Sequence, residues 1–212
     1  MRAPSAVAAE HFEDLKQQGH AARLGMWAFL GQEMLLFAGL FALYSAYRSM
    51  YRADFHQAAL HMSVALGTAN TFVLLTSSLT VALSIWAARA RRPRACIGFL
   101  IATLLLAAAF LVLKFTEYGH HFAEGIFPGR YYHFAELPQH GAHIFFTLYF
   151  FMTGLHALHV IAGMGVLTWV LLHALQHHWT PEHHVGIELG GMYWHLVDLI
   201  WIFIWPLLYL VL

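Results

Sequence analysis

The chain has 212 residues, of which 60% are hydrophobic, 16% aromatic and only 10% charged. Soluble domains carry about 25% charged residues, so this composition excludes an ordinary soluble enzyme and indicates a membrane protein. Eleven basic and eleven acidic residues cancel, which argues against nucleic-acid binding, and a single cysteine, Cys96, excludes an internal disulfide.

Five apolar stretches are long enough to cross a bilayer, which takes about 20 helical residues. We expect these spans at residues 24–47, 64–88, 95–118, 143–172 and 189–212. Residues 1–23 mix charges with alanines and lack the apolar core of a signal peptide, so they predict a cytoplasmic tail. The expected fold is an all-α, polytopic membrane helix bundle with five transmembrane helices, formed by a single domain at 24–212.

The distribution of arginine and lysine predicts the orientation of the bundle. Seven of these residues lie in the tail and the second loop, and three lie on the opposite side. The N-terminus should therefore be cytoplasmic and the C-terminus periplasmic. Five tryptophans would then form an aromatic belt near the cytoplasmic interface: Trp27, Trp86, Trp169, Trp179 and Trp194.

The second span carries small and polar side chains at a spacing of seven residues. The stripe consists of Ser63, Asn70, Ser77 and Ser84, with Gly67, Leu74 and Val81 alongside. Small residues on one face allow two helices to approach closely. We interpret the stripe as a packing seam, with a polar substrate path as the alternative.

Several ionisable residues fall inside the spans, where their cost makes each one a functional hypothesis. Glu33 lies nine residues into the first span with no cation within one turn, so it should be neutral or paired with another helix or chain. Glu33 would then serve in proton handling or in contact with a lipid or another subunit, or it would be a protonated packing residue. Lys114 and Glu117, three residues apart, predict a structural ion pair whose side chains can reach outward to the interface.

Two further histidine sets lie in the fourth and fifth spans. His156 and His159 share a helix face, and His195 lies three residues before Asp198. Haem ligation would require axial partners from facing helices, and the other spans offer too few histidines for two such sites. We therefore expect His156 and His159 to form hydrogen bonds between helices, with Glu117 or Asp198 as candidate partners, and we expect no metal site.

Five segments carry a resemblance to subunit III of the haem-copper cytochrome c oxidases. GLHALHVIAG (154–163) and HHVGIELGGMYWHLVDLIWIFIW (183–205) resemble that family most strongly. LGMWAFLGQEMLLFAGLFALY (24–44), NTFVLLTSSLTVAL (70–83) and KFTEYGHHF (114–122) are similar to its other helices, in family order. The resemblance covers about residues 24–212.

This resemblance implies a multi-pass subunit of the bacterial inner membrane that binds no cofactor itself. It would stabilise the catalytic subunit I, which holds haem and copper, support proton uptake, bind phospholipid, and lie in a complex with the copper-bearing subunit II. Glu33 would be the family's intramembrane carboxylate. The family's buried polar signature would correspond to Lys114, Glu117, His156, His159, Glu188, His195 and Asp198.

The chain also departs from many relatives in three respects. It has five spans rather than seven, and Gln32 stands where many relatives have serine before the glutamate. After the fourth span, histidines stand where relatives often carry basic residues for lipid phosphates. Our candidates for lipid headgroup contacts are His173, His178, His183, His184 and Trp194.

Three other functions remain open from the sequence. The first is the accessory subunit of a bacterial nitric oxide reductase, which is also five-helical and similar around LGMW (24–27). The second is an independent redox cytochrome, which a visible spectrum would reveal. The third is a proton-coupled transporter that uses Glu33 and Asp198, although the sequence has no inverted repeat.

Overall fold

The computed structural model describes residues 14–176 and 185–210 of the chain. These residues form the helices α1 (Leu15–Met50), α2 (Arg52–Leu60), α3 (Val64–Arg89), α4 (Pro93–Ala123), α5 (His140–Leu175) and α6 (Val185–Tyr209), with a 3-10 turn η1 at Gly129–Tyr131. Five of them, α1, α3, α4, α5 and α6, are long and apolar enough to cross a membrane. The prediction of an all-α bundle with five spans is confirmed.

Local sequence signals explain where several helices begin. Asp14 caps α1 by accepting a hydrogen bond from the backbone N–H of Gln17 at 2.7 Å, so α1 begins within the segment expected to be a tail. Ser63 caps α3 in the same way through Leu66, at 3.3 Å. Pro93 stands at the first position of α4, where its missing N–H has no helical partner to lose.

The loops differ from the expectation in two places. A short helix that the sequence did not predict, α2, follows α1 directly and buries Phe55, Ala58 and Ala59 against the bundle. The segment 119–142, expected to be one long loop, is shorter, because α4 continues to Ala123 and α5 begins at His140. A long helix satisfies its backbone hydrogen bonds internally, which favours extending each span as far as glycine and proline allow.

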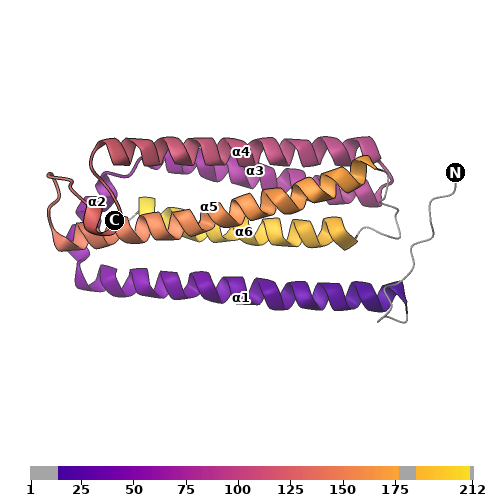
Figure 1. The fold of residues 1–212 in the computed structure, drawn as a ribbon, viewed down its shortest axis with the longest axis horizontal. Helices are drawn as coiled ribbons and strands as arrows, with labels where there is room; N and C mark the ends of the chain where they lie inside the picture. The colour runs from indigo at the N-terminus through magenta and orange to yellow at the C-terminus, as the bar shows by residue number, and fades with distance from the viewer. Residues whose placement is uncertain (1–13, 177–184, 211–212) are drawn as a thin grey trace.

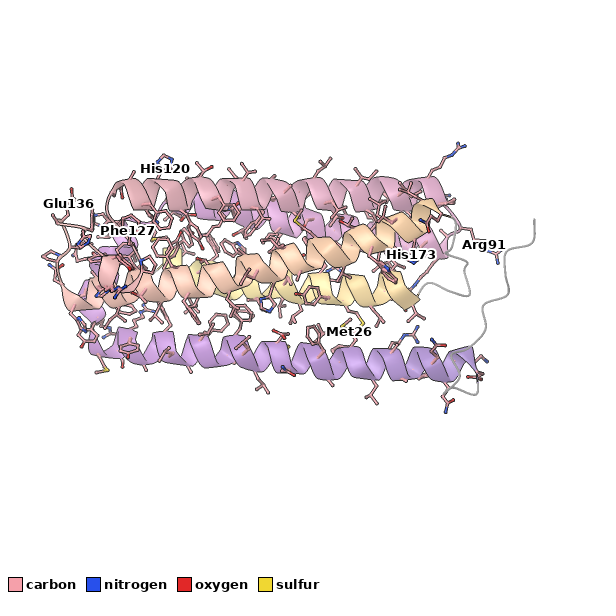
Figure 2. The ribbon with its side chains drawn as sticks, in the orientation of Figure 1. Met26, Arg91, His120, Phe127, Glu136 and His173 are labelled. Atoms are coloured by element: carbon pink, nitrogen blue, oxygen red, sulfur yellow. The ribbon has the colours of Figure 1, made fainter. Side chains whose placement is uncertain are left out.

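The five long helices lie side by side, with α5 and α6 between α1 and the pair formed by α3 and α4 (Figure 1). The short helix α2 lies at one end, next to α5. We call this the loop end; Figure 2 shows His120, Phe127 and Glu136 there. Arg91 and His173 lie at the opposite end, which we call the arginine end. Which end faces the cytoplasm stays a prediction.

The small-residue stripe of α3 is a packing seam, as the sequence predicted. Its members from Gly67 to Ser84 are buried, whereas Ser63 caps the helix instead. A Cβ atom on Gly67 would lie 2.8 Å from the ring of Tyr209, so α6 packs directly on this glycine. The indole N–H of Trp194 donates to Ser77 Oγ at 3.0 Å, and that of Trp201 donates to Thr71 Oγ1 at 3.1 Å.

The tryptophans divide between the surface and the core. Trp27, Trp86 and Trp169 are exposed, as expected for an aromatic belt, and Trp179 lies outside the described residues. Trp194 has 0% exposure, so its assignment to the belt was wrong. The physical reason is the glycine at position 163 of α5, where a Cβ atom would lie 2.8 Å from the Trp194 ring. This glycine lets the indole pack into the interior.

Candidate functional site: the buried ionisable side chains

Glu33 of α1 pairs with His159 of α5. Glu33 Oε2 and His159 Nε2 are 2.8 Å apart, and the two side chains are only 11% and 14% exposed. His159 Nδ1 lies 2.8 Å from the carbonyl oxygen of Leu155. The partner that we expected for Glu33 on another helix is therefore His159, which lies in the segment GLHALHVIAG (154–163).

The hydrogen bonds of His159 limit where protons can be. A carbonyl oxygen only accepts, so Nδ1 must donate to Leu155 and carry a proton. The contact with Glu33 then needs one further proton, located either on Nε2 beside a carboxylate or on a carboxylic acid beside a neutral imidazole. Both arrangements are neutral overall, which suits a membrane interior.

His156 makes different contacts from His159. Its ring lies against Phe110 of α4 and Trp201 of α6, with centroids 5.6 and 5.1 Å away. Neither ring nitrogen has a hydrogen-bond partner among the residues that the structure describes, so the expected interhelical hydrogen bond of His156 was wrong. At about 100° per residue, three positions rotate the side chain by roughly 60° net, which directs His159 toward α1 and His156 into the core.

Lys114 and Glu117 of α4 form the expected ion pair, with 3.1 Å between Nζ and Oε2. The expectation that they reach outward was wrong, because they are 1% and 2% exposed. The ammonium also donates to the hydroxyls of Tyr149 and Tyr209, at 3.0 and 2.6 Å, and Tyr209 donates to Glu117 Oε1 at 2.6 Å. The inward geometry satisfies all three ammonium protons, so the pair does not need water.

Glu188 joins three helices at the arginine end. Its Oε2 accepts from Arg23 of α1 at 2.9 Å, and its Oε1 accepts from Arg89 of α3 at 2.5 Å. The carboxylate itself is 12% exposed, whereas the two arginines are more open to solvent. Glu188 thereby fixes the beginning of α6 against the beginning of α1 and the end of α3.

His195 and Asp198 of α6 are not hydrogen-bonded to each other. His195 Nδ1 lies 2.7 Å from Ser78 Oγ of α3. Asp198 is 3% exposed, and neither of its carboxyl oxygens has a hydrogen-bond partner in the part of the chain that the structure describes. The two side chains therefore do not form a pair with each other.

Of the five candidates for lipid headgroup contacts, the structure describes His173 and Trp194. His173 is half-buried, with its ring 4.2 Å from the ring of Trp169. Trp194 is buried and cannot reach a headgroup, so that assignment was wrong. His178, His183 and His184 lie outside the described residues.

Three hydrogen-bond partners of these groups were not predicted from the sequence. Tyr149, Tyr209 and Ser78 were not singled out, although a tyrosine in an apolar helix normally needs a hydrogen-bond partner and so gives a usable signal. Across residues 14–176 and 185–210, no three His, Cys, Asp or Glu side chains gather as a metal ion would require.

Comparison with known proteins decides the family. The model of the cytochrome c oxidase subunit III family matches residues 5–211. The chain belongs to this family. The buried pairs described above are therefore features of a subunit III, a family whose named members are parts of oxidase complexes.

Individual relatives of this subunit III agree with that assignment. Cytochrome c oxidase subunit 3 of Corynebacterium diphtheriae is 30% identical, over 100% of this chain and 95% of the relative. Quinol oxidase subunit 3 of Bacillus subtilis is 30% identical, over 92% and 89%. The chicken (Gallus gallus) cytochrome c oxidase subunit 3 is 34% identical, over 66% of this chain but 48% of its own length. The match to bacterial subunits is thus nearly end to end.

Proposed function

We propose that the chain is the non-redox subunit III of a proton-pumping terminal cytochrome c oxidase in a bacterial inner membrane. Its partners would be the haem-copper subunit I and the copper-bearing subunit II, together with bound phospholipid. The family match over residues 5–211 carries this proposal. Nothing in the matches favours the nitric oxide reductase alternative.

The geometry supports a stabilising rather than an electron-transferring role. The buried charged side chains of α1, α4 and α5 are neutralised inside the bundle, as Lys114–Glu117 and Glu33–His159. Such pairs fix the relative positions of helices, since separating them would leave a charge without a partner in an apolar medium. A firmly fixed bundle is a suitable lateral support for a catalytic subunit.

Within this function, Glu33 would be the residue that supports sustained proton uptake. It holds one proton jointly with His159, partway along a membrane-crossing helix. Replacing it by glutamine keeps the shape but removes the ionisable group. We expect Glu33→Gln to assemble normally and to shorten the lifetime of the oxidase during turnover.

The test measures oxidase activity against the number of turnovers in the purified complex. The matched control is Glu136→Gln at the loop end, where the carboxylate is 76% exposed and should not matter. If Glu33→Gln and Glu136→Gln both inactivate at the wild-type rate with unchanged lipid content, Glu33 is a packing residue only.

The electron donor is the other part of the proposal that needs a direct test. The relatives include subunits of both cytochrome c and quinol oxidases. We expect the purified complex to oxidise reduced cytochrome c. Activity with quinol and none with cytochrome c would replace the donor in this proposal and leave the family assignment intact.

A further inference from the structure

Several polar side chains carry buried atoms without a hydrogen-bond partner among the described residues. Besides His121 at the loop end, they are Asn70 of α3, His156 of α5, and Asp198 and Trp205 of α6. Asn70 and His156 have no exposed surface at all. A buried polar group normally finds a partner, so four in one bundle require an explanation.

Contacts between α3 and α6 place Asn70 beside two tryptophans. The Trp201 indole N–H reaches Thr71, the residue after Asn70, at 3.1 Å. One turn away, a Cβ atom on Gly67 would lie 3.0 Å from the Trp205 ring. Gly67 and Asn70 are three residues apart and so share a face of α3. The amide of Asn70 therefore lies on the seam between the levels of Trp201 and Trp205.

The other two side chains reach the same region from α5 and α6. The ring of His156 lies 5.1 Å from the ring of Trp201, with Phe110 closing its other side at 5.6 Å. Asp198 precedes Trp201 by three residues, within one turn of α6. We call Asn70, His156, Asp198 and Trp205 the Trp201 cluster, because each lies within one turn of Trp201, contacts its ring, or adjoins a residue that binds it.

The chemistry of the Trp201 cluster identifies a ligand. Its atoms comprise amide and indole donors, a carbonyl and a carboxyl acceptor, and an imidazole that needs one of each. Water supplies two donors and two acceptors and is the usual bridge between buried polar groups that cannot reach each other. A cation would need more oxygen ligands than Asn70 and Asp198 provide. We propose that the Trp201 cluster binds water molecules inside the bundle.

The first test uses the unchanged protein as purified from its membrane. Radiolysis generates hydroxyl radicals at bound water, so nearby side chains are oxidised even when buried. Trp201 and Trp194 form a matched pair, because both are 0% exposed and both donate their indole N–H to a hydroxyl. We expect severalfold faster oxidation of Trp201. Equal rates at the two tryptophans would overturn the proposal.

The second test is the sign of a stability change. In a dry cluster, replacing a partnerless imidazole by an apolar ring of similar shape is neutral or stabilising. In a hydrated cluster, His156→Phe removes a water ligand and should lower the melting temperature. His120→Phe, at an exposed position of α4, is the control and should change nothing. A melting temperature of His156→Phe at or above that of the wild type would contradict the inference.

A double substitution tests whether the members act through shared water. Asn70→Leu and His156→Phe should together cost less than the sum of their separate effects, because both remove ligands of the same water. Asn70→Leu and Ser84→Ala, 14 residues apart and so about 21 Å along α3, should be additive. Additivity in both pairs would show that Asn70 and His156 share no ligand. None of these tests depends on the oxidase partners.

Discussion

At the scale of single residues, the two histidines of α5 differ because of where they point. His159 faces α1 and completes a neutral pair with Glu33, whereas His156 faces the core among aromatic rings. Their spacing of three residues, read alone, suggested equivalent roles. What separates them is the identity of the facing helix, which a single sequence does not reveal.

The first prediction concerns the carboxyl group of Glu33. In His159→Leu, the carboxyl loses the hydrogen-bond partner that holds it against α5. Hydrophobic carbodiimides react with carboxyl groups in apolar surroundings, and a carboxyl freed from the histidine is more available to them, so the labelling rate of Glu33 should rise severalfold, as measured by mass spectrometry. His173→Leu, distant at the arginine end, should label at the wild-type rate. A lower rate in His159→Leu would contradict the proposed pair.

The second prediction concerns the buried pair of α4. Lys114→Met leaves Glu117 and its tyrosine partner in the core without the ammonium and should cost about 3–5 kcal/mol of stability. Adding Glu117→Leu should recover part of this loss, since no lone charge remains. The measurement is thermal unfolding of the single and the double variant. If Lys114→Met unfolds at the wild-type temperature, the pair contributes little to stability.

At the scale of helices, the spans could be predicted but their contacts only in part. Length and composition suffice for a membrane helix, and the stripe of α3 indicated a seam before its partner helix was known. α6 was harder, because its tryptophans and tyrosines combine an apolar ring with one polar group, which suits a membrane interface as well as a core. The error at Trp194 follows directly from that property.

The third prediction tests the contact between α3 and α6. In Gly67→Ala, the added methyl would lie 2.8 Å from the Tyr209 ring, so the helices must separate and stability should fall by about 1–3 kcal/mol. Gly98→Ala in α4 is the matched control, because nothing lies within 4 Å of its added methyl. That variant should be neutral or up to about 1 kcal/mol more stable. Equal effects of both substitutions on thermal unfolding would argue against the close approach.

At the scale of the whole molecule, polar contacts fasten the bundle at both ends. Glu188 holds α1, α3 and α6 together at the arginine end. Toward the loop end, Tyr209 of α6 contacts Lys114 and Glu117 of α4. These contacts join residues more than 90 positions apart in the sequence. A further contact spans 163 positions, since the hydroxyl of Tyr44 donates to the carbonyl oxygen of Leu207. Periodicity along a helix cannot predict such pairings, because they depend on how the helices assemble.

For the whole complex, we propose that the chain has no redox centre of its own and assembles with subunits that do. The direct measurement is affinity purification of the chain from its native membrane, followed by visible spectra of the complex and of the chain dissociated from it. We expect haem absorption and haem-copper subunits in the complex, and no Soret band in the separated chain. Stoichiometric haem in the separated chain, or its recovery without any haem-copper subunit, would contradict the account.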